Sequence, residues 1–174
     1  MTDQTAIICA RIFHDLASPL GAISAGVELA AMSGQHSEET DLMSESARAA
    51  LAKLHFFKWS FGHLGPTVVP VQTLLDVLAE IAPKITVSGL PNSGLHPAQA
   101  KILCLAVGFC LDRKQFDIQL AFEVGPKSAV SFPPVMRTPS DADDGAFSSY
   151  VFDLIMGGEI RSQRTEAGLT LQLV

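Results

Sequence analysis

The stretch CARIFHDLASPLGAISAGVELA, residues 9–30, decides the fold of this 174-residue chain. Its apolar and small residues recur in alternating steps of four and three, the heptad spacing of helices that pack in a bundle. The spacing returns after a short break that holds Gly34, suited to a helix end, and Ser37, suited to a helix start. The pattern therefore predicts a hairpin of two helices within residues 4–62. The seam positions are Cys9, Phe13, Leu16, Leu20, Ile23, Val27 and Ala30 in the first helix, and Met43, Ala47, Ala50, Leu54, Phe57 and Phe61 in the second.

Two helices alone cannot bury both of these apolar seams. A second copy of the hairpin would bury them in a four-helix bundle around a two-fold axis. The composition agrees with hidden apolar surface, because 48% of the residues are apolar and only 17% are charged, against about 25% charged in an average soluble domain. We therefore expect a homodimer.

Pro19 lies in the middle of the first heptad stretch and leaves two alternatives open. A proline inside a helix lacks the amide proton, kinks the axis and costs about 3 kcal/mol. In one alternative Ser18 caps a helix that starts at Pro19. In the other, one kinked helix continues through Pro19 and the carbonyl of Asp15 is released. The heptad phase runs unbroken from Cys9 to Ala30, which favours the single kinked helix.

The pattern changes after residues 64–70, LGPTVVP, whose two prolines and glycine predict a linker. Beyond the linker, helical stretches alternate with β-rich ones. Their order, αβαββαββ, predicts an α+β sandwich in which helices cover one face of a sheet. The predicted helices are 71–81, 97–113 and 145–156, and the predicted strands are 85–88, 117–124, 129–132, 159–163 and 169–174.

Charge and motif content exclude several classes of protein. A net charge of −6 argues against nucleic acid as a partner. The longest apolar run, residues 102–111, is far shorter than the roughly 20 residues that cross a bilayer, and residues 1–5 lack the basic region of a signal peptide. We therefore expect a cytoplasmic protein that does not engage membranes. The 3 cysteines form no C-x-x-C pair and the 5 histidines show no metal-binding spacing, so we expect reduced thiols and no metal site.

The residues suited to chemistry are concentrated in FHDLASPL, residues 13–20. His14 lies beside the predicted seam, where it remains accessible to another protein. An imidazole with an unperturbed pKa of about 6.5 is mostly uncharged at neutral pH and has a free lone pair, so it is a competent nucleophile. Asp15 is its neighbour in sequence, and Ser18 is one turn further on the same face. A nearby carboxylate can hydrogen-bond the second ring nitrogen and support the charge that develops during attack.

The run HDLASPLGAI, residues 14–23, resembles the H-box of sensor histidine kinases, in which the phosphorylated histidine is followed by an acid and then by Pro-Leu. It is closer still to ChpT-type histidine phosphotransferases. The resemblance implies that His14 is the phosphoacceptor and that Asp15 and Ser18 are its catalytic neighbours. It also implies a dimer of chains with two domains. These are a helical hairpin for dimerisation and phosphotransfer, residues 1–63, and a degenerate kinase-type ATPase-like α/β domain, residues 71–174.

The second half of the sequence separates a kinase from a relay protein. A kinase-type ATPase domain needs an asparagine on its second helix to hold Mg²⁺ and ATP, but the single asparagine, Asn92, precedes the predicted helix 97–113. The glycine-rich adenine loop is missing, with DDG at residues 143–145 at most a relic, and the chain has no P-loop motif. We therefore expect no bound ATP and no cofactor of its own, with Mg²⁺ held by the partner receiver domain.

These features lead to three hypotheses about function. The favoured one is a relay, in which His14 accepts phosphate from the phospho-aspartate of a receiver domain, for example in a hybrid kinase, and passes it to a response regulator. The alternative is a dimeric adaptor that binds receiver domains on a kinase-like scaffold without catalysis. The third, an ATP-dependent kinase, is disfavoured by the missing nucleotide motifs.

A candidate docking surface for a receiver domain surrounds His14. Gly21 and Ala25 follow Ser18 on one predicted face, with Ala17 and Ala22 beside it, and small side chains let a partner helix approach closely. The same residues are equally consistent with an alanine-rich exposed stripe of no function. Arg11, one turn before His14, could meet phosphate or an acidic receiver rim, although a solvated surface arginine is the more common case.

Overall fold

The computed structural model describes residues 12, 15–16, 18–23, 25–26, 29, 38–61, 66–125, 127–134, 138 and 145–174. Several positions on which the sequence predictions depend lie outside these residues. They are the proposed phosphoacceptor, two residues of the candidate docking surface, four seam positions and the predicted hairpin turn: His14, Arg11, Ala17, Cys9, Phe13, Val27, Ala30 and residues 33–37.

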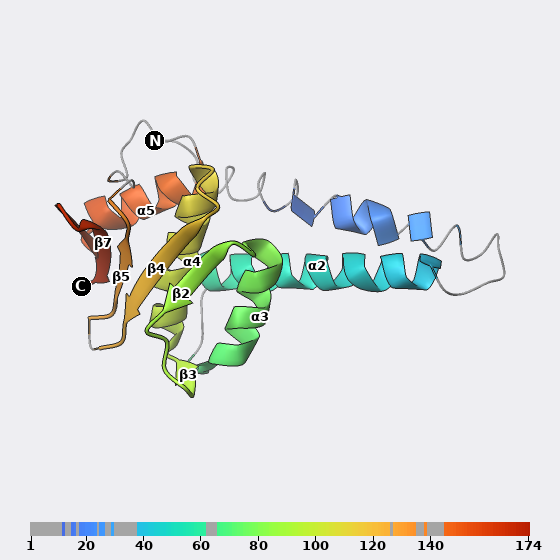
Figure 1. Ribbon diagram of the computed structural model, residues 1–174, viewed down its shortest axis with the longest axis horizontal. Helices are drawn as coiled ribbons and strands as arrows, with labels where there is room; N and C mark the ends of the chain where they lie inside the picture. The colour runs from blue at the N-terminus through green and yellow to red at the C-terminus, as the bar shows by residue number, and fades with distance from the viewer. Residues whose placement is uncertain are drawn as a thin grey trace.

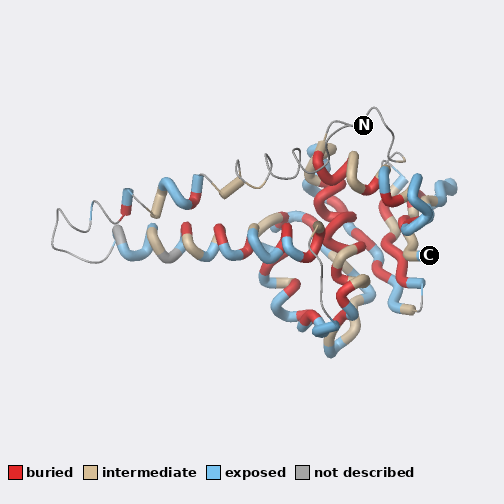
Figure 2. Tube along the Cα trace, turned by 180° about the vertical axis from the view of Figure 1, so that it is seen from behind, coloured by how far each residue is buried: buried red, intermediate tan, exposed pale blue. Residues whose placement is uncertain are grey.

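The N-terminal helical segment consists of the described residues between Ile12 and Leu29, and each of them is helical. Asp15 and Leu16 are helical before Pro19, and residues 20–23 are helical after it. Helical backbone on both sides of the proline supports the single helix over a helix that starts at Pro19. The segment runs alongside α2, Glu38–Phe61, in both views of the chain (Figures 1 and 2).

The α/β part of the chain contains a sheet with strand order β2-β4-β5-β7-β6 among the described residues. Strands β2 and β4 are parallel, and the remaining neighbours are antiparallel. On β4 the inward side chains Ile118, Leu120 and Phe122 are buried while the intervening ones are exposed, so one face of the sheet is covered and the other is open. The strands are β2 Ile85–Ser88, β4 Ile118–Glu123, β5 Ala129–Phe132, β6 Ile160–Thr165 and β7 Gly168–Leu173, and the helices are α3 Val71–Ile81, α4 Pro97–Asp112 and α5 Ala146–Met156.

These bounds confirm the predicted mixed α+β class, but a small sheet of two strands was missed. Within the stretch predicted as a linker, β1, Val69–Pro70, pairs antiparallel with β3, Gly94–Leu95. Strands of two residues carry no periodicity that a sequence pattern could show. Leu95 is fully buried, so this small sheet anchors the start of α3 to the core.

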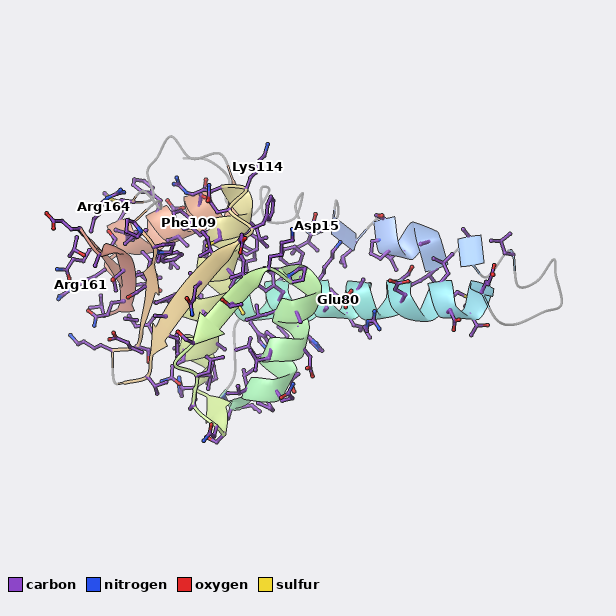
Figure 3. All side chains as sticks on the ribbon, viewed as in Figure 1. Asp15, Glu80, Phe109, Lys114, Arg161 and Arg164 are labelled. Atoms are coloured by element: carbon purple, nitrogen blue, oxygen red, sulfur yellow. The ribbon has the colours of Figure 1, made fainter. Side chains whose placement is uncertain are left out.

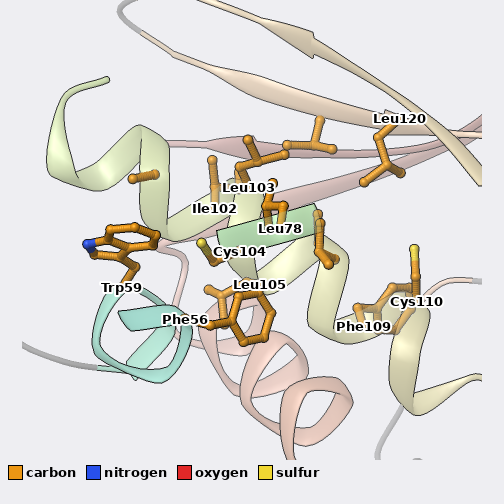
Figure 4. Close-up of a cluster of buried hydrophobic side chains, with 14 of the residues drawn as sticks. Phe56, Trp59, Leu78, Ile102, Leu103, Cys104, Leu105, Phe109, Cys110 and Leu120 are labelled. Carbon is orange, nitrogen blue, oxygen red and sulfur yellow. The ribbon is translucent and has the colours of Figure 1, made fainter. Parts of the chain in front are cut away.

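The core is centred on α4, the most apolar helix of the chain. Pro97 occupies its first turn, and His96 and Gln99 form a reciprocal capping box that fixes where it begins. Every residue from Ile102 to Cys110 is buried against the sheet, α2 or α5 (Figure 4). Burial raises the pKa of the Cys104 thiol and that of the Cys110 thiol, the latter to about 12, so both remain protonated and pack as small hydrophobes.

A cluster of aromatic rings, here called the aromatic junction, joins α2 to the α/β part. Phe147 of α5 lies 5.4 Å from Phe56 and 4.9 Å from Phe61 between ring centroids, and Phe61 also meets the ring edge of Tyr150 at 5.2 Å. Gly108 on α4 permits this packing, because a Cβ there would lie 2.1 Å from the Phe147 ring. Phe57 and Phe61, predicted as seam positions, thus pack against α5 within the chain. The junction consists of Phe56, Phe57, Phe61, Phe147 and Tyr150.

In the part of the chain that the structure describes, no helix combines the length and the apolar character needed to cross a bilayer.

Candidate functional site

The described residues around the H-box place one face of the N-terminal helical segment in solvent. Ser18, Gly21 and Ala25 are exposed, and Ala22 beside them is half-buried, while Pro19 on the opposite side is buried. A Cβ at Gly21 would meet no atom within 4 Å. The described residues of the candidate docking surface are therefore accessible to solvent. His14, four residues before Ser18 in the sequence, lies outside the described residues.

The carbonyl of Asp15 makes a contact that the sequence did not reveal. Pro19 has no amide proton to donate to this carbonyl, four residues earlier in the helix. Instead, Nζ of Lys53 on α2 donates a hydrogen bond to the Asp15 carbonyl oxygen at 2.9 Å. The Asp15 carbonyl, which the sequence predicted to lose its helical hydrogen bond, thus has a hydrogen-bond donor on the neighbouring helix. Pro19 in the sequence shows that the Asp15 carbonyl lacks its helical donor, but nothing in the sequence indicates Lys53 as the replacement.

A cleft of about 400 Å³ opens beside this contact, between the helical segments and the α/β part. Its polar lining residues are Asp15, Lys53, Glu80 of α3 and Lys114 after α4, of which Figure 3 labels Asp15, Glu80 and Lys114. A second cavity of about 240 Å³ adjoins it and shares the exposed Phe116. The H-box backbone therefore borders a mixed polar and apolar cleft rather than a closed interface. The remaining lining residues are Phe56, Phe57, Ile81, Leu111 and Phe147.

The N-terminus of α5 is occupied by a side chain of the chain itself. Oδ2 of Asp112, in the last turn of α4, accepts hydrogen bonds from the backbone amides of Phe147 at 2.8 Å and Ser148 at 2.9 Å. Amides at a helix N-terminus attract anions, phosphate among them. Gly145 passes so close that a Cβ there would lie 2.2 Å from the same carboxylate oxygen. Asp112 thus takes the place at this helix end that an anionic ligand would need.

Replacing Asp112 with alanine is expected to lower the free energy of unfolding by about 1–3 kcal/mol, because two amides of α5 lose a charged acceptor. Urea denaturation followed by circular dichroism measures the change. Asp117→Ala is the matched control, since Asp117 is exposed five residues later, and it should change stability by less than about 0.5 kcal/mol. Equal effects of the two substitutions would contradict a capping role for Asp112.

The described residues contain no cluster of three or more His, Cys, Asp or Glu side chains that could hold a metal ion.

The described helices are joined through the aromatic junction to the α+β part, and the H-box motif lies in the first of them. The chain shares this fold with a solved bacterial phosphotransferase at a TM-score of 0.61, with 23% identity over 99% of this chain and 96% of that chain. A histidine kinase domain from the blue-light activated histidine kinase of Erythrobacter litoralis EL346 is more distant, at a TM-score of 0.38 and 15% identity over 98% of this chain and 92% of that one.

The sequence is similar to protein phosphotransferase ChpT of Brucella abortus (strain 2308), with 41% identity over 71 residues. That match spans 41% of this chain and 34% of the relative, so the chain spans about a third of the length of the curated protein it matches. No family model matches the chain. The resemblance to ChpT-type phosphotransferases stated from the H-box is confirmed by the sequence match and the shared fold.

Proposed function

We propose that the protein is a histidine phosphotransferase of a phosphorelay, with His14 as the residue that carries the phosphoryl group. One observation supports it most directly: the helix face one turn beyond His14, with Ser18, Gly21 and Ala25, is exposed and free of bulky side chains. A receiver domain needs such a face to bring its phospho-aspartate close to a histidine. The similarity to ChpT adds support to the same assignment.

The proposed reaction is an in-line transfer between two proteins. A ring nitrogen of His14 attacks the phosphorus, the N–P bond forms as the bond from phosphorus to the aspartyl oxygen breaks, and the aspartate leaves as a carboxylate. Mg²⁺ and a lysine of the receiver domain neutralise the equatorial oxygens, while Asp15 supports the positive charge on the imidazole. A second receiver domain reverses these steps and removes the phosphoryl group.

We propose further that the phosphate donor is a protein and that the chain does not use ATP. Asp112 supports this, because its carboxylate occupies the α5 N-terminus and would repel a phosphate group there. The sequence of α4, Pro97–Asp112, contains no asparagine that could hold Mg²⁺. The α/β part then serves as a scaffold rather than as a nucleotide site.

The docking surface is proposed to include Gly21, Ala22 and Ala25, together with Arg11 and Ala17. The small side chains permit a partner helix to pack closely, and the guanidinium of Arg11 would face the acidic rim of a receiver active site. This arrangement gives the chain one surface for both donor and acceptor, which a relay requires.

A transfer assay tests the proposed function. Purified receiver domains of the same genome are charged with radiolabelled acetyl phosphate, freed of donor and mixed with the protein. We expect acid-labile, base-stable label on the chain within minutes from at least one receiver domain. Stable complexes with receiver domains but no label would favour the adaptor alternative, and label from ATP alone would favour a kinase; either result overturns the relay.

We also propose that the chain forms a homodimer through a four-helix bundle. Leu20 and Leu54, both predicted seam positions, are 55% and 46% exposed in the single chain. A second hairpin would cover them and remove this apolar surface from water.

Replacing Leu54 with glutamate is expected to convert the dimer to monomer at micromolar concentration, because a buried unpaired carboxylate costs several kcal/mol. Sedimentation velocity reports the oligomeric state directly. Met156→Glu is the control, since Met156 is 72% exposed on α5 and lies away from the seam, so that variant should remain a dimer. A wild-type chain that sediments as a monomer would refute the bundle.

A further inference from the structure

The hydrogen bond from Lys53 to Asp15 links the two helices at one defined atom. The two residues are 38 positions apart in the sequence, and the donor is an ammonium group on α2 while the acceptor is a main-chain carbonyl of the H-box. A side chain that reaches across to a carbonyl without an i+4 amide donor replaces the helical hydrogen bond that Pro19 cannot make. The contact therefore supports the main chain at the turn that lacks the amide proton of residue 19.

The proposed phosphoacceptor is next to Asp15 in the sequence. Asp15 shares a peptide bond with His14, so a rotation of the backbone at Asp15 also changes the direction of the Cα–Cβ bond of His14. An in-line transfer requires the attacking nitrogen to lie about 3–3.5 Å from phosphorus with the correct alignment. Small errors in backbone direction at this turn are thus expected to lower the rate even when a partner binds normally.

The placement of Lys53 suits it to hold this geometry. Its side chain is half-buried and lines the cleft that borders the H-box, together with Phe56 and Phe57. A charged donor makes a stronger hydrogen bond to a carbonyl than a neutral amide does. Glu80 and Lys114 line the same cleft, and Glu80 pairs with Arg48 of α2.

We propose that Lys53 is a positioning residue for phosphotransfer, which holds the proline-interrupted H-box turn in the orientation that aims His14 at the incoming phosphorus. This inference rests on the proposed function. It assigns to α2 a role in the reaction itself, in addition to its role in packing.

The first test replaces Lys53 with methionine, which keeps the length of the side chain and removes the donor. With a receiver domain charged by radiolabelled acetyl phosphate, the first-order transfer rate at saturation should fall about ten-fold, while the receiver concentration for half-maximal rate stays within two-fold. Lys53→Arg, which retains a charged donor, should recover most of the rate. Arg48→Met is the matched control, because Arg48 is a basic residue on α2 that pairs with Glu80 at 3.3 Å and should leave transfer unchanged.

The second test uses Pro19 to distinguish positioning from general stabilisation. Pro19→Ala restores an amide that can donate to the Asp15 carbonyl, so the Lys53→Met substitution should lower the transfer rate by less than about two-fold in that background. The ring resonances of His14 in NMR spectra should shift in Lys53→Met and return in the double variant, while those of His55 stay constant. A thermal midpoint measured for each variant shows whether the chain remains folded.

The outcomes separate this inference from the proposed function. If the wild-type chain takes no label from any receiver domain, the proposed function fails. If the wild type is labelled on His14 but Lys53→Met transfers at the wild-type rate, or loses the same factor with and without Pro19, the positioning role of Lys53 is refuted and the relay stands.

Discussion

Replacing His14 with glutamine is expected to abolish phosphotransfer, with label on the chain falling to background, on the order of a thousand-fold or more. Glutamine has a similar reach but no lone pair on a ring nitrogen, so no covalent route for the phosphoryl group remains. The measurement is acid-labile label after mixing with a charged receiver domain. Because the exposed face that contains Ser18 and Gly21 is unchanged, the variant should still bind the receiver domain.

The matched control for this result is His55→Gln. His55 is an exposed histidine on α2 that stacks on Trp59, with ring centroids 5.6 Å apart. The variant should retain full labelling, since its imidazole lies on the other helix of the hairpin. If His14→Gln still accepts label, the phosphoacceptor is elsewhere, and if His55→Gln loses it, the assignment of the two histidines must be exchanged.

Replacing Phe147 with alanine is expected to lower the free energy of unfolding by about 3–5 kcal/mol, a large share of the stability of a single chain. Phe147 is 1% exposed and lies within 6.1 Å of three rings of α2 by centroid distance. Removing it leaves a cavity at the aromatic junction, where Gly108 brings the backbone of α4 against the missing ring. Urea denaturation monitored by Trp59 fluorescence measures the loss.

Phe116→Ala provides the comparison for this loss. Phe116 is 52% exposed at the rim of the cleft, so its removal should cost less than about 1 kcal/mol. A similar loss of stability for both variants would mean that Phe147 contributes no more to the free energy of unfolding than an exposed phenylalanine does. In that case α2 would be held to the α/β part by other contacts, such as those of Trp59 and Ala52.

Much of the fold could be predicted because its elements carry strong local periodicity. The heptad steps of α2 predicted its helical conformation, and the alternation of β4 predicted which of its side chains are buried. The unbroken heptad phase across Pro19 also predicted a helix that continues beyond the proline. The strands β1 and β3 were missed because pairs of two residues leave no pattern.

The candidate site could be predicted only in part, because its decisive contacts join residues far apart in sequence. The H-box motif led to the prediction of Asp15 and Ser18 as site residues, but it gave no sign of the hydrogen bond that Lys53 of α2 donates to the Asp15 carbonyl. The cap of α5 was equally hidden. Gly145 at the start of that helix offers no side chain, and the acceptor, Asp112, comes from the end of the preceding helix. Composition and spacing predict single helices and strands well. They do not show which side chain of a distant element donates or accepts the hydrogen bonds at the end of a helix or beside a proline.

The aromatic junction has a consequence for the timing of signalling. Moving the α/β part away from α2 would expose the rings of the aromatic junction to water, at a free-energy cost of about 1.5–3 kcal/mol for each buried side chain. Separation of α2 from the α/β part is therefore disfavoured. In the proposed relay the cycle is then timed by the partners, since one receiver domain must leave before the next can use the same surface. The rate of repeated phosphotransfer would be limited by how long each receiver domain stays bound. Complexes with micromolar Kd and fast dissociation are therefore favoured over tight ones.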